Sequence, residues 1–269
     1  MVGTGVVGLT TARAIRRRHP AMPVTVYAKD LDVRTTTSAI AAGKFDPAGL
    51  GRAHAQGAGR DRLDGWLTDA RAALRSLQPA WQRYGIAERD SFTLQPPSRD
   101  NTGLVDLPFD RLNQPGRMER SQLLDPTRLL PALQTELVER GVRFEPRWLQ
   151  SRRDLVQLDA TVVVLCVGYG AKALLGDDAL VPKRGHLVRL QRPTAEHDYL
   201  LGVACKAGPP CYVFCRGDDI VLGGTVITGD DRTAVHADDQ AVFDRVLTRA
   251  AEVFAGRVLR CGWPGDKGA

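Results

Sequence analysis

Apolar residues recur at helical spacing in four stretches of the chain, which predicts four amphipathic helices. In the first stretch, Val7, Ala12 and Ile15 fall on one stripe. In the second, the same period places Trp66 and Trp81 on the face that packs on a core. The predicted helices cover residues 6–18, 63–84, 125–141 and 237–254.

Short runs rich in β-branched residues predict strands between these helices. The run at residues 161–167 is continuous and apolar, which is typical of a strand covered on both faces. From Arg184 onward, tight turns such as Gly217-Asp218-Asp219 separate the strands and favour an antiparallel sheet. The predicted strands are residues 24–28, 142–144, 161–167, 186–190, 211–216 and 220–225. This order predicts an α/β fold, with a Rossmann-like domain and a second, antiparallel-sheet domain.

Composition and charge narrow the class of protein. The chain has 269 residues, 43% of them hydrophobic, which is enough for one large core or two modest ones. It has no run of about 18 uncharged apolar residues and no signal-like N-terminus, so we expect a cytoplasmic protein with no membrane partner. The net charge of +6 is scattered along the chain, which fits a solvated surface better than a nucleic-acid patch. Five cysteines without a CxxC pair predict reduced structural thiols and no metal site.

A glycine motif at the start of the first helix predicts a dinucleotide site. Gly3, Gly5 and Gly8 form a GxGxxG pattern, and a strand followed by the acidic Asp30 comes about twenty residues later. The first two glycines allow a tight turn and close approach of a pyrophosphate, which the amides and positive end of the helix stabilise. The third lets the helix pack closely on the sheet.

Only Met1 and Val2 precede this motif, although a buried central strand is expected there. We therefore expect the glycine loop to have no anchored end and the two neighbouring strands to lose their partner. The hypothesis is that the true N-terminus lies upstream or that the nucleotide binds poorly.

Several separate segments together resemble the D-amino-acid oxidases and D-aspartate oxidases. The most specific is Thr36-Thr37-Ser38-Ala39-Ile40-Ala41-Ala42-Gly43, which is similar to their Thr-Thr-x-x-x-Ala-Ala-Gly segment. Others agree in order and spacing, and the resemblance extends to about Arg260. They are residues 163–174, Pro182-x-Arg184-Gly185, Tyr212-Val213-Phe214 and Leu222-Gly223-Gly224.

The resemblance implies FAD as cofactor and gives a role to each matching position. Lys29 stands where the family often has an acidic residue at the ribose, so Asp30 is the candidate for that contact. Tyr212 matches the tyrosine whose hydroxyl binds the substrate carboxylate. The remaining candidates are Gly3, Gly5, Val6, Val7 and Gly8 at the pyrophosphate; Thr36, Thr37 and Ser38 near the phosphates and ribityl chain; Ala41, Ala42 and Gly43 beside the flavin ring; Leu149 at the adenine; and Gly168 at a strand end that passes the cofactor.

The implied reaction is the oxidative deamination of D-amino acids by oxygen, giving 2-oxo acids, ammonia and hydrogen peroxide. No acid/base dyad is required, and His186 is expected to be a packed residue rather than a base. The partners are then a D-amino acid and oxygen. Lys206 and Arg216 are candidate cations for an acidic substrate. The oligomeric state is left open, with a homodimer as one option.

The resemblance also implies a division into domains. Residues 1–47 and 123–180 correspond to a discontinuous FAD-binding domain, and residues 48–122 and 181–256 to a substrate domain. Residues 257–269 are set apart as an off-family tail, and the last nine of them, Cys261 to Ala269, resemble nothing in the family. They stand where the family has a Gly-x-Arg-Pro segment, whose arginine holds the substrate carboxylate. The alternative is therefore a truncated, inactive relative or a binding protein. An NAD-dependent dehydrogenase is disfavoured because no nicotinamide-like segment follows the first strand-helix-strand unit.

Overall fold

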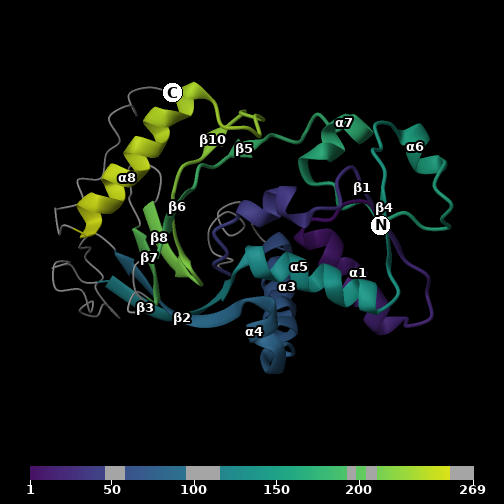
Figure 1. Cartoon of the computed structure of the whole chain (residues 1–269), viewed down its shortest axis with the longest axis horizontal. Coiled ribbons are helices and arrows are strands. Elements are labelled where there is room, and N and C mark those ends of the chain that lie inside the picture. The colour runs from purple at the N-terminus through teal and green to yellow at the C-terminus, as the bar shows by residue number, and fades with distance from the viewer. Residues whose placement is uncertain (46–57, 95–115, 193–197, 204–210, 255–269) are drawn as a thin grey trace.

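The structure is a computed structural model, and it describes residues 1–45, 58–94, 116–192, 198–203 and 211–254. One end of the molecule holds a small parallel sheet with two long helices, and the other holds a larger sheet covered by a third long helix (Figure 1). The predicted α/β fold with a second sheet is confirmed.

The parallel sheet forms around the first residues of the chain. Strand β1 (Thr25–Ala28) pairs in parallel with β4 (Arg143–Pro146). On the other side of β1, Val2 makes parallel bridges to both Tyr27 and Leu165. The Gly3 amide donates to Tyr27 (2.8 Å), and the Val2 amide donates to the Val164 carbonyl (2.9 Å). The prediction that the neighbouring segments would lose their partner is therefore wrong, because Met1 to Gly3 pair with both.

Helices α1 (Val6–Arg18) and α5 (Pro126–Glu139) pack together over this sheet. Their inner faces bury Leu9 and Ala12 of α1 against a leucine stripe of α5. Val7 was predicted on the same buried stripe, but 60% of its surface is exposed. The α5 helix begins where the sequence predicts, because the Asp125 side chain accepts a hydrogen bond from the Thr127 amide (3.0 Å).

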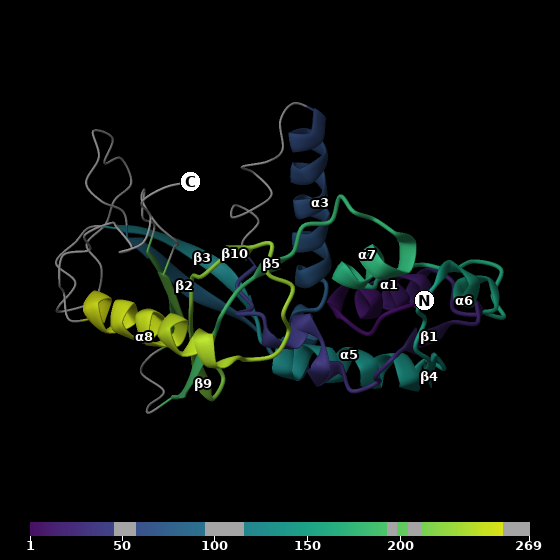
Figure 2. The same ribbon diagram turned by 90° about the horizontal axis from the view of Figure 1, so that it is seen from above.

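The predicted helix over residues 63–84 is broken into three elements. They are α3 (Ala58–Arg75), η3 (Gln78–Ala80) and α4 (Trp81–Tyr84). Pro79 causes the break, since proline lacks the amide hydrogen that a continuous helix requires. Figure 2 shows α3 pointing away from α1 and α5. Trp66 is consequently 61% exposed, contrary to prediction, whereas Trp81 is half-buried and its indole donates to the Leu74 carbonyl (2.8 Å).

Within the described residues, the larger sheet has six strands in the order β3-β2-β7-β8-β9-β6. All neighbours are antiparallel except β2 and β7. The sequence prediction missed β2, β3 and β7. Polar residues occupy the middle of β2 and β3, and β7 is only five residues long. The strands are β2 (Ile86–Leu94), β3 (Gly116–Leu124), β6 (Val188–Gln191), β7 (Tyr199–Val203), β8 (Cys211–Arg216) and β9 (Asp219–Gly223).

Helix α8 (Gln240–Phe254) lies on one face of this sheet (Figure 1). It buries Val246, Ala250 and Val253 against strand residues such as Leu201 and Val213. The opposite face carries Leu123, Leu200 and Phe214, which pack with Ala42 from the N-terminal part of the chain. The sheet thus has a core on each face, and the second of these joins the two ends of the molecule.

The segment at residues 161–167 differs most from prediction. It is half-exposed rather than covered on both faces, with Val162 72% exposed, and it makes only an isolated bridge to Val2. The remaining elements are η1 (Val33–Thr35), η2 (Thr37–Ile40), α6 (Arg152–Val156), η4 (Gly168–Gly170), α7 (Ala171–Leu175), β5 (Lys183–Arg184), β10 (Ile227–Thr228) and η5 (Ala237–Asp239).

Within the described residues, no helix is long and apolar enough to cross a membrane. No group of three or more histidine, cysteine, aspartate or glutamate side chains in the same residues is arranged to hold a metal ion.

Candidate functional site

The glycine loop is shaped by close contacts that exclude side chains at two of its three glycines. Gly3 has a φ of 109°, and a Cβ there would collide with the carbonyl oxygen of Cys166. A Cβ on Gly8 would collide with the carbonyl oxygen of Gly3, so the helix and the loop touch backbone to backbone. Gly5 differs, because a Cβ there would meet only the hydroxyl of Ser38, at 3.2 Å. The backbone therefore leaves no room for a side chain at Gly3 or Gly8, whereas there is space beside Gly5.

The start of α1 has the chemistry to hold an anion. Gly5 is the N-cap and has no side chain to occupy the free amides, and the first turn contains no acidic residue. The Val6 amide already has a partner within the protein, since it donates to the Ser38 hydroxyl (3.0 Å). The amides of Val7 and Gly8 belong to the same turn, whose N–H groups have no acceptor within the helix. These residues fit the diphosphate of a dinucleotide, which the positive end of the helix stabilises.

Of the three hydroxyl residues predicted beside the phosphates, Ser38 is the one that contacts the glycine loop. The Thr36 hydroxyl donates to the carbonyl of Val33 (2.7 Å), which closes the turn of η1. Thr37 is exposed at the start of η2. Thr36 therefore has a structural role in this arrangement, and Ser38 ties η2 to the start of α1.

The predicted ribose and adenine residues follow the ends of the paired strands β1 and β4. Asp30 is exposed, and its carboxylate accepts a hydrogen bond from the amide of Asp32 (2.8 Å). Leu149 is half-buried in the cluster that contains Val2. The residues that precede them in sequence, Lys29 and Trp148, also meet. The Lys29 ammonium lies 5.8 Å from the centre of the Trp148 ring, which is a cation-π contact on a 67% exposed indole. Sequence reasoning missed Trp148, although an aromatic residue next to Leu149 was the available signal.

The segment predicted to border the flavin ring is fixed to the larger sheet. Ala42 packs in one apolar cluster with Leu123, Leu200, Phe214 and Tyr212. Its neighbour, Gly43, has a φ of 91°, and a Cβ there would collide with the carbonyl oxygen of Leu124. The structure therefore explains the glycine at position 43 through the protein backbone alone. We refer to residues 41–43 below as the wall segment.

Tyr212 lies on β8 with its ring held on two sides. It stacks on Phe214 with 4.5 Å between ring centres and 17° between planes. On the neighbouring strand, a Cβ on Gly223 would collide with the phenol, so this glycine makes room for the ring. Burial raises the pKa of Tyr212 to about 12, the thiol of Cys211 adds to the rise, and Arg216 opposes it. The phenol therefore keeps its proton and is available as a hydrogen-bond donor.

The glycine loop and Tyr212 are connected by a short piece of chain. Ser38 accepts from the first turn of α1, and Ala42 packs on the same apolar cluster as Tyr212. Four residues span at most about 14 Å when fully extended. The structure thus brings Tyr212 to within one short segment of the start of α1, rather than to the far side of the molecule.

Three further predicted positions remain, namely Gly168, Lys206 and Arg216. Gly168 has a φ of 54° and begins η4 after the segment that pairs with Val2, and it is exposed. Lys206 lies outside the described residues. Arg216 does not serve as a cation for an acidic substrate, because its side chain is completely buried and pairs with Asp219 (2.9 Å). That prediction is wrong.

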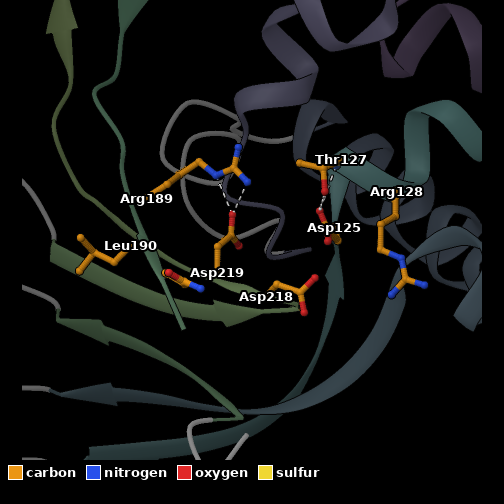
Figure 3. A pocket seen from close by; sticks show the side chains of 9 residues that line it. Asp125, Thr127, Arg128, Arg189, Leu190, Asp218 and Asp219 are labelled. Carbon is orange, nitrogen blue, oxygen red and sulfur yellow. Dashed lines mark hydrogen bonds and ion pairs between the residues drawn. The ribbon is translucent and has the colours of Figure 1, made fainter. Parts of the chain in front are cut away.

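The open pocket in Figure 3 is not the predicted site. It has a volume of about 460 Å³ and lies between the start of α5 and strands β6 and β9. Two of its carboxylates already have structural partners, since Asp125 accepts from the Thr127 hydroxyl (2.6 Å) and Asp219 from Arg189 (2.6 Å). None of the predicted cofactor or substrate residues lines it. We interpret this pocket as a gap where the larger sheet meets the start of α5.

Comparison with known proteins supports the flavin interpretation of this geometry. The sequence profile of the FAD dependent oxidoreductase family (DAO) matches residues 108–265, more than half of the chain. The chain belongs to this family. Its cofactor is therefore FAD, and its reaction class is oxidation, with amino-acid oxidation represented among its relatives.

Members of the DAO family with curated names align over most of the chain. A D-amino-acid oxidase from Streptomyces coelicolor is 28% identical over 96% of this chain and 79% of its own length. The human D-aspartate oxidase is 26% identical over 86% of this chain and 69% of its own length. Among solved structures, the glycine oxidase from Geobacillus kaustophilus has a TM-score of 0.70 at 18% identity, covering 94% of this chain and 77% of that one, which indicates a shared fold.

Proposed function

We propose that this chain catalyses the FAD-dependent oxidative deamination of D-amino acids. The observation that carries the proposal is that Tyr212 and Ala42 pack against the same apolar cluster, which puts a largely desolvated hydroxyl donor near the wall segment. The alignment with curated D-amino-acid and D-aspartate oxidases supports the choice of substrate class. When bound, FAD takes two electrons from the substrate and passes them to oxygen, which gives hydrogen peroxide.

The contribution of the protein is binding, orientation and exclusion of water. Tyr212 donates its phenolic proton in a hydrogen bond to the substrate carboxylate, and such a bond to an ionised group is stronger than one between neutral groups. The ring cannot turn freely, because Phe214 and Gly223 hold it on two sides. The donor is therefore already in place when the substrate arrives, and Leu200 adds an apolar surface next to it. The product imino acid hydrolyses to a 2-oxo acid and ammonia.

The test is direct. The purified chain is heated to release its cofactor, which is identified by fluorescence, and peroxide release is measured with D-alanine, D-aspartate, glycine and L-alanine. We expect FAD at close to one per chain and peroxide with at least one D-amino acid but not with L-alanine. A yellow protein active only on glycine or L-alanine would overturn the proposed substrate class. A colourless folded protein would favour the alternative of an inactive relative.

A further inference from the structure

Arg216 occupies an unusual place for a charged residue. Its side chain is fully buried, at the end of β8, and it is the largest completely buried side chain among the described residues. Removing a guanidinium from water costs several kcal/mol unless its donors are satisfied, so its partners indicate what the burial achieves.

Those partners come from two distant parts of the chain. Nε of Arg216 donates to one oxygen of Asp219 (2.9 Å), and one terminal nitrogen donates to the other oxygen (3.3 Å). The second terminal nitrogen donates to the carbonyl oxygen of Ala41 (2.7 Å), which lies 175 residues away in sequence. A two-pronged bond on one side leaves the guanidinium plane fixed, so the third donor points in a defined direction.

The alternation of β8 aligns this contact with Tyr212. Residues two apart in a strand share a face, so Tyr212, Phe214 and Arg216 point the same way, and Val213 points toward α8. On the shared face Tyr212 packs on the same apolar cluster as Ala42, while Arg216 donates to the Ala41 carbonyl. One strand therefore holds both the hydroxyl donor and the wall segment.

We propose that Arg216, braced by Asp219, is a positioning residue that sets the wall segment against the flavin in register with Tyr212. The inference rests on the proposed site, in which the wall segment borders the flavin ring. Removal of the guanidinium frees the Ala41 carbonyl and lets the wall segment shift. FAD is then held more weakly and less rigidly, although no atom of Arg216 need touch it.

The experiment compares three variants by titrating FAD into the apoprotein and following the quenching of flavin fluorescence. Arg216→Met removes both contacts, and Arg216→Lys keeps a charge that cannot make the forked bond and the Ala41 bond together. Arg189→Met is the matched control, because Arg189 pairs with the same Asp219 (2.6 Å) from an exposed position and has no contact with Ala41. We expect the Kd for FAD to rise at least about tenfold in Arg216→Met, less in Arg216→Lys, and less than about twofold in Arg189→Met.

A second measurement separates positioning from a merely structural role. At saturating FAD, the visible circular dichroism of bound flavin is expected to change in both Arg216 variants and to match wild type in Arg189→Met. If Arg216→Met folds with wild-type Kd and wild-type dichroism, the proposal is wrong. If Arg216→Met does not fold, Arg216→Lys decides in the same way. If the wild-type protein binds FAD but oxidises no D-amino acid, the proposed function is wrong, whereas the comparison of FAD binding among the variants remains valid.

Discussion

Gly3 and Gly8 must be glycines because of contacts within the protein chain, whereas Gly5 has space around it. A Cβ at Gly3 would collide with the carbonyl of Cys166, and a Cβ at Gly8 would collide with the carbonyl of Gly3. Both are backbone groups, so relieving either collision would require the backbone to move. At Gly5 the only neighbour is the movable hydroxyl of Ser38. The three positions of one motif thus separate into two that form the loop and one that faces the predicted ligand.

Substitution by alanine distinguishes these roles. Gly3→Ala is expected to destabilise the fold by about 2 kcal/mol or more, because a Cβ at a φ of 109° is strained as well as crowded. Gly5→Ala is expected to keep the thermal midpoint of the apoprotein and to raise the Kd for FAD by about tenfold, since its methyl group occupies space that the diphosphate needs. Thermal unfolding and FAD titration measure the two effects. An unchanged Kd in Gly5→Ala would argue against a diphosphate at this loop.

Tyr212 allows an equally local prediction. Tyr212→Phe keeps the stacked ring but removes the donor, so the KM for a D-amino acid is expected to rise about tenfold or more, as for a lost bond to a charged group. Because burial raises the pKa of Tyr212 to about 12, its hydroxyl keeps its proton and its contribution should be constant below about pH 10. Steady-state kinetics from pH 6 to pH 10 test both points. Tyr199→Phe is the control, since Tyr199 packs in the cluster under α8, and a similar rise there would contradict the assignment.

Among the elements, the start of α8 is held by a compact set of buried charges. The Asp239 carboxylate of η5 accepts two hydrogen bonds from Arg184 of β5 (2.7 and 2.6 Å). Its other neighbours are Nε2 of His186 (3.0 Å) and the amide of His236 (2.9 Å). His186 is 4% exposed, so it is a packed residue, as the sequence predicts. The set joins η5 and α8 to β5 and so fixes the helix that covers the larger sheet.

This set makes the stability depend on acid pH with a defined sign. The Arg184 guanidinium, with the His236 amide, holds the pKa of Asp239 well below its ordinary value. The unfolded chain takes up this proton first, so the contribution of Asp239 is present above about pH 4 and is lost as the pH falls below it. Asp239→Asn is therefore expected to lower Tm at pH 7 and to approach wild type near pH 3. Asp244→Asn, at an exposed site on α8, is the control for both measurements. An equal difference at both pH values would contradict the assignment.

On the scale of the whole molecule, the chain after the wall segment joins the two ends. The Leu124 amide of β3 donates to the carbonyl of Gly43 (2.8 Å), and the Phe45 amide donates to Gln122 (2.9 Å). Lys44 adds an ion pair with Glu119 (3.1 Å). The segment from Ser38 to Phe45 therefore runs from the start of α1 to the edge of the larger sheet, and a cofactor along it would contact both ends of the molecule.

FAD is consequently expected to stabilise the fold as a whole. A ligand at 100 times its Kd adds about 2.7 kcal/mol to the free energy of unfolding. For a chain of this size, that corresponds to a rise in Tm of roughly 5–10 °C. Thermal unfolding of the apoprotein with increasing FAD measures it. FMN, which lacks the adenylate half, should give a smaller shift, and an absence of any shift with FAD would contradict the predicted site.

The sequence alone determined the features that depend on neighbouring residues. The α1 helix, the capped start of α5, the β8 strand and the glycine motif are local patterns, and each lies where predicted. The spacing of apolar residues failed as a guide where a proline interrupts the helix. Trp66 has the spacing of a core residue, yet the break at Pro79 leaves α3 pointing outward.

Only the tertiary structure decided which distant residues meet. Nothing in the local sequence says that Val2 completes a sheet with two segments far along the chain, or that Arg216 bonds to Ala41. Both contacts have backbone carbonyl oxygens as acceptors, which every residue has and which therefore leave no pattern in the side chains. The sequence predicted the residues of the flavin site, and only the tertiary structure showed that Ala42 and Tyr212 pack on one apolar cluster.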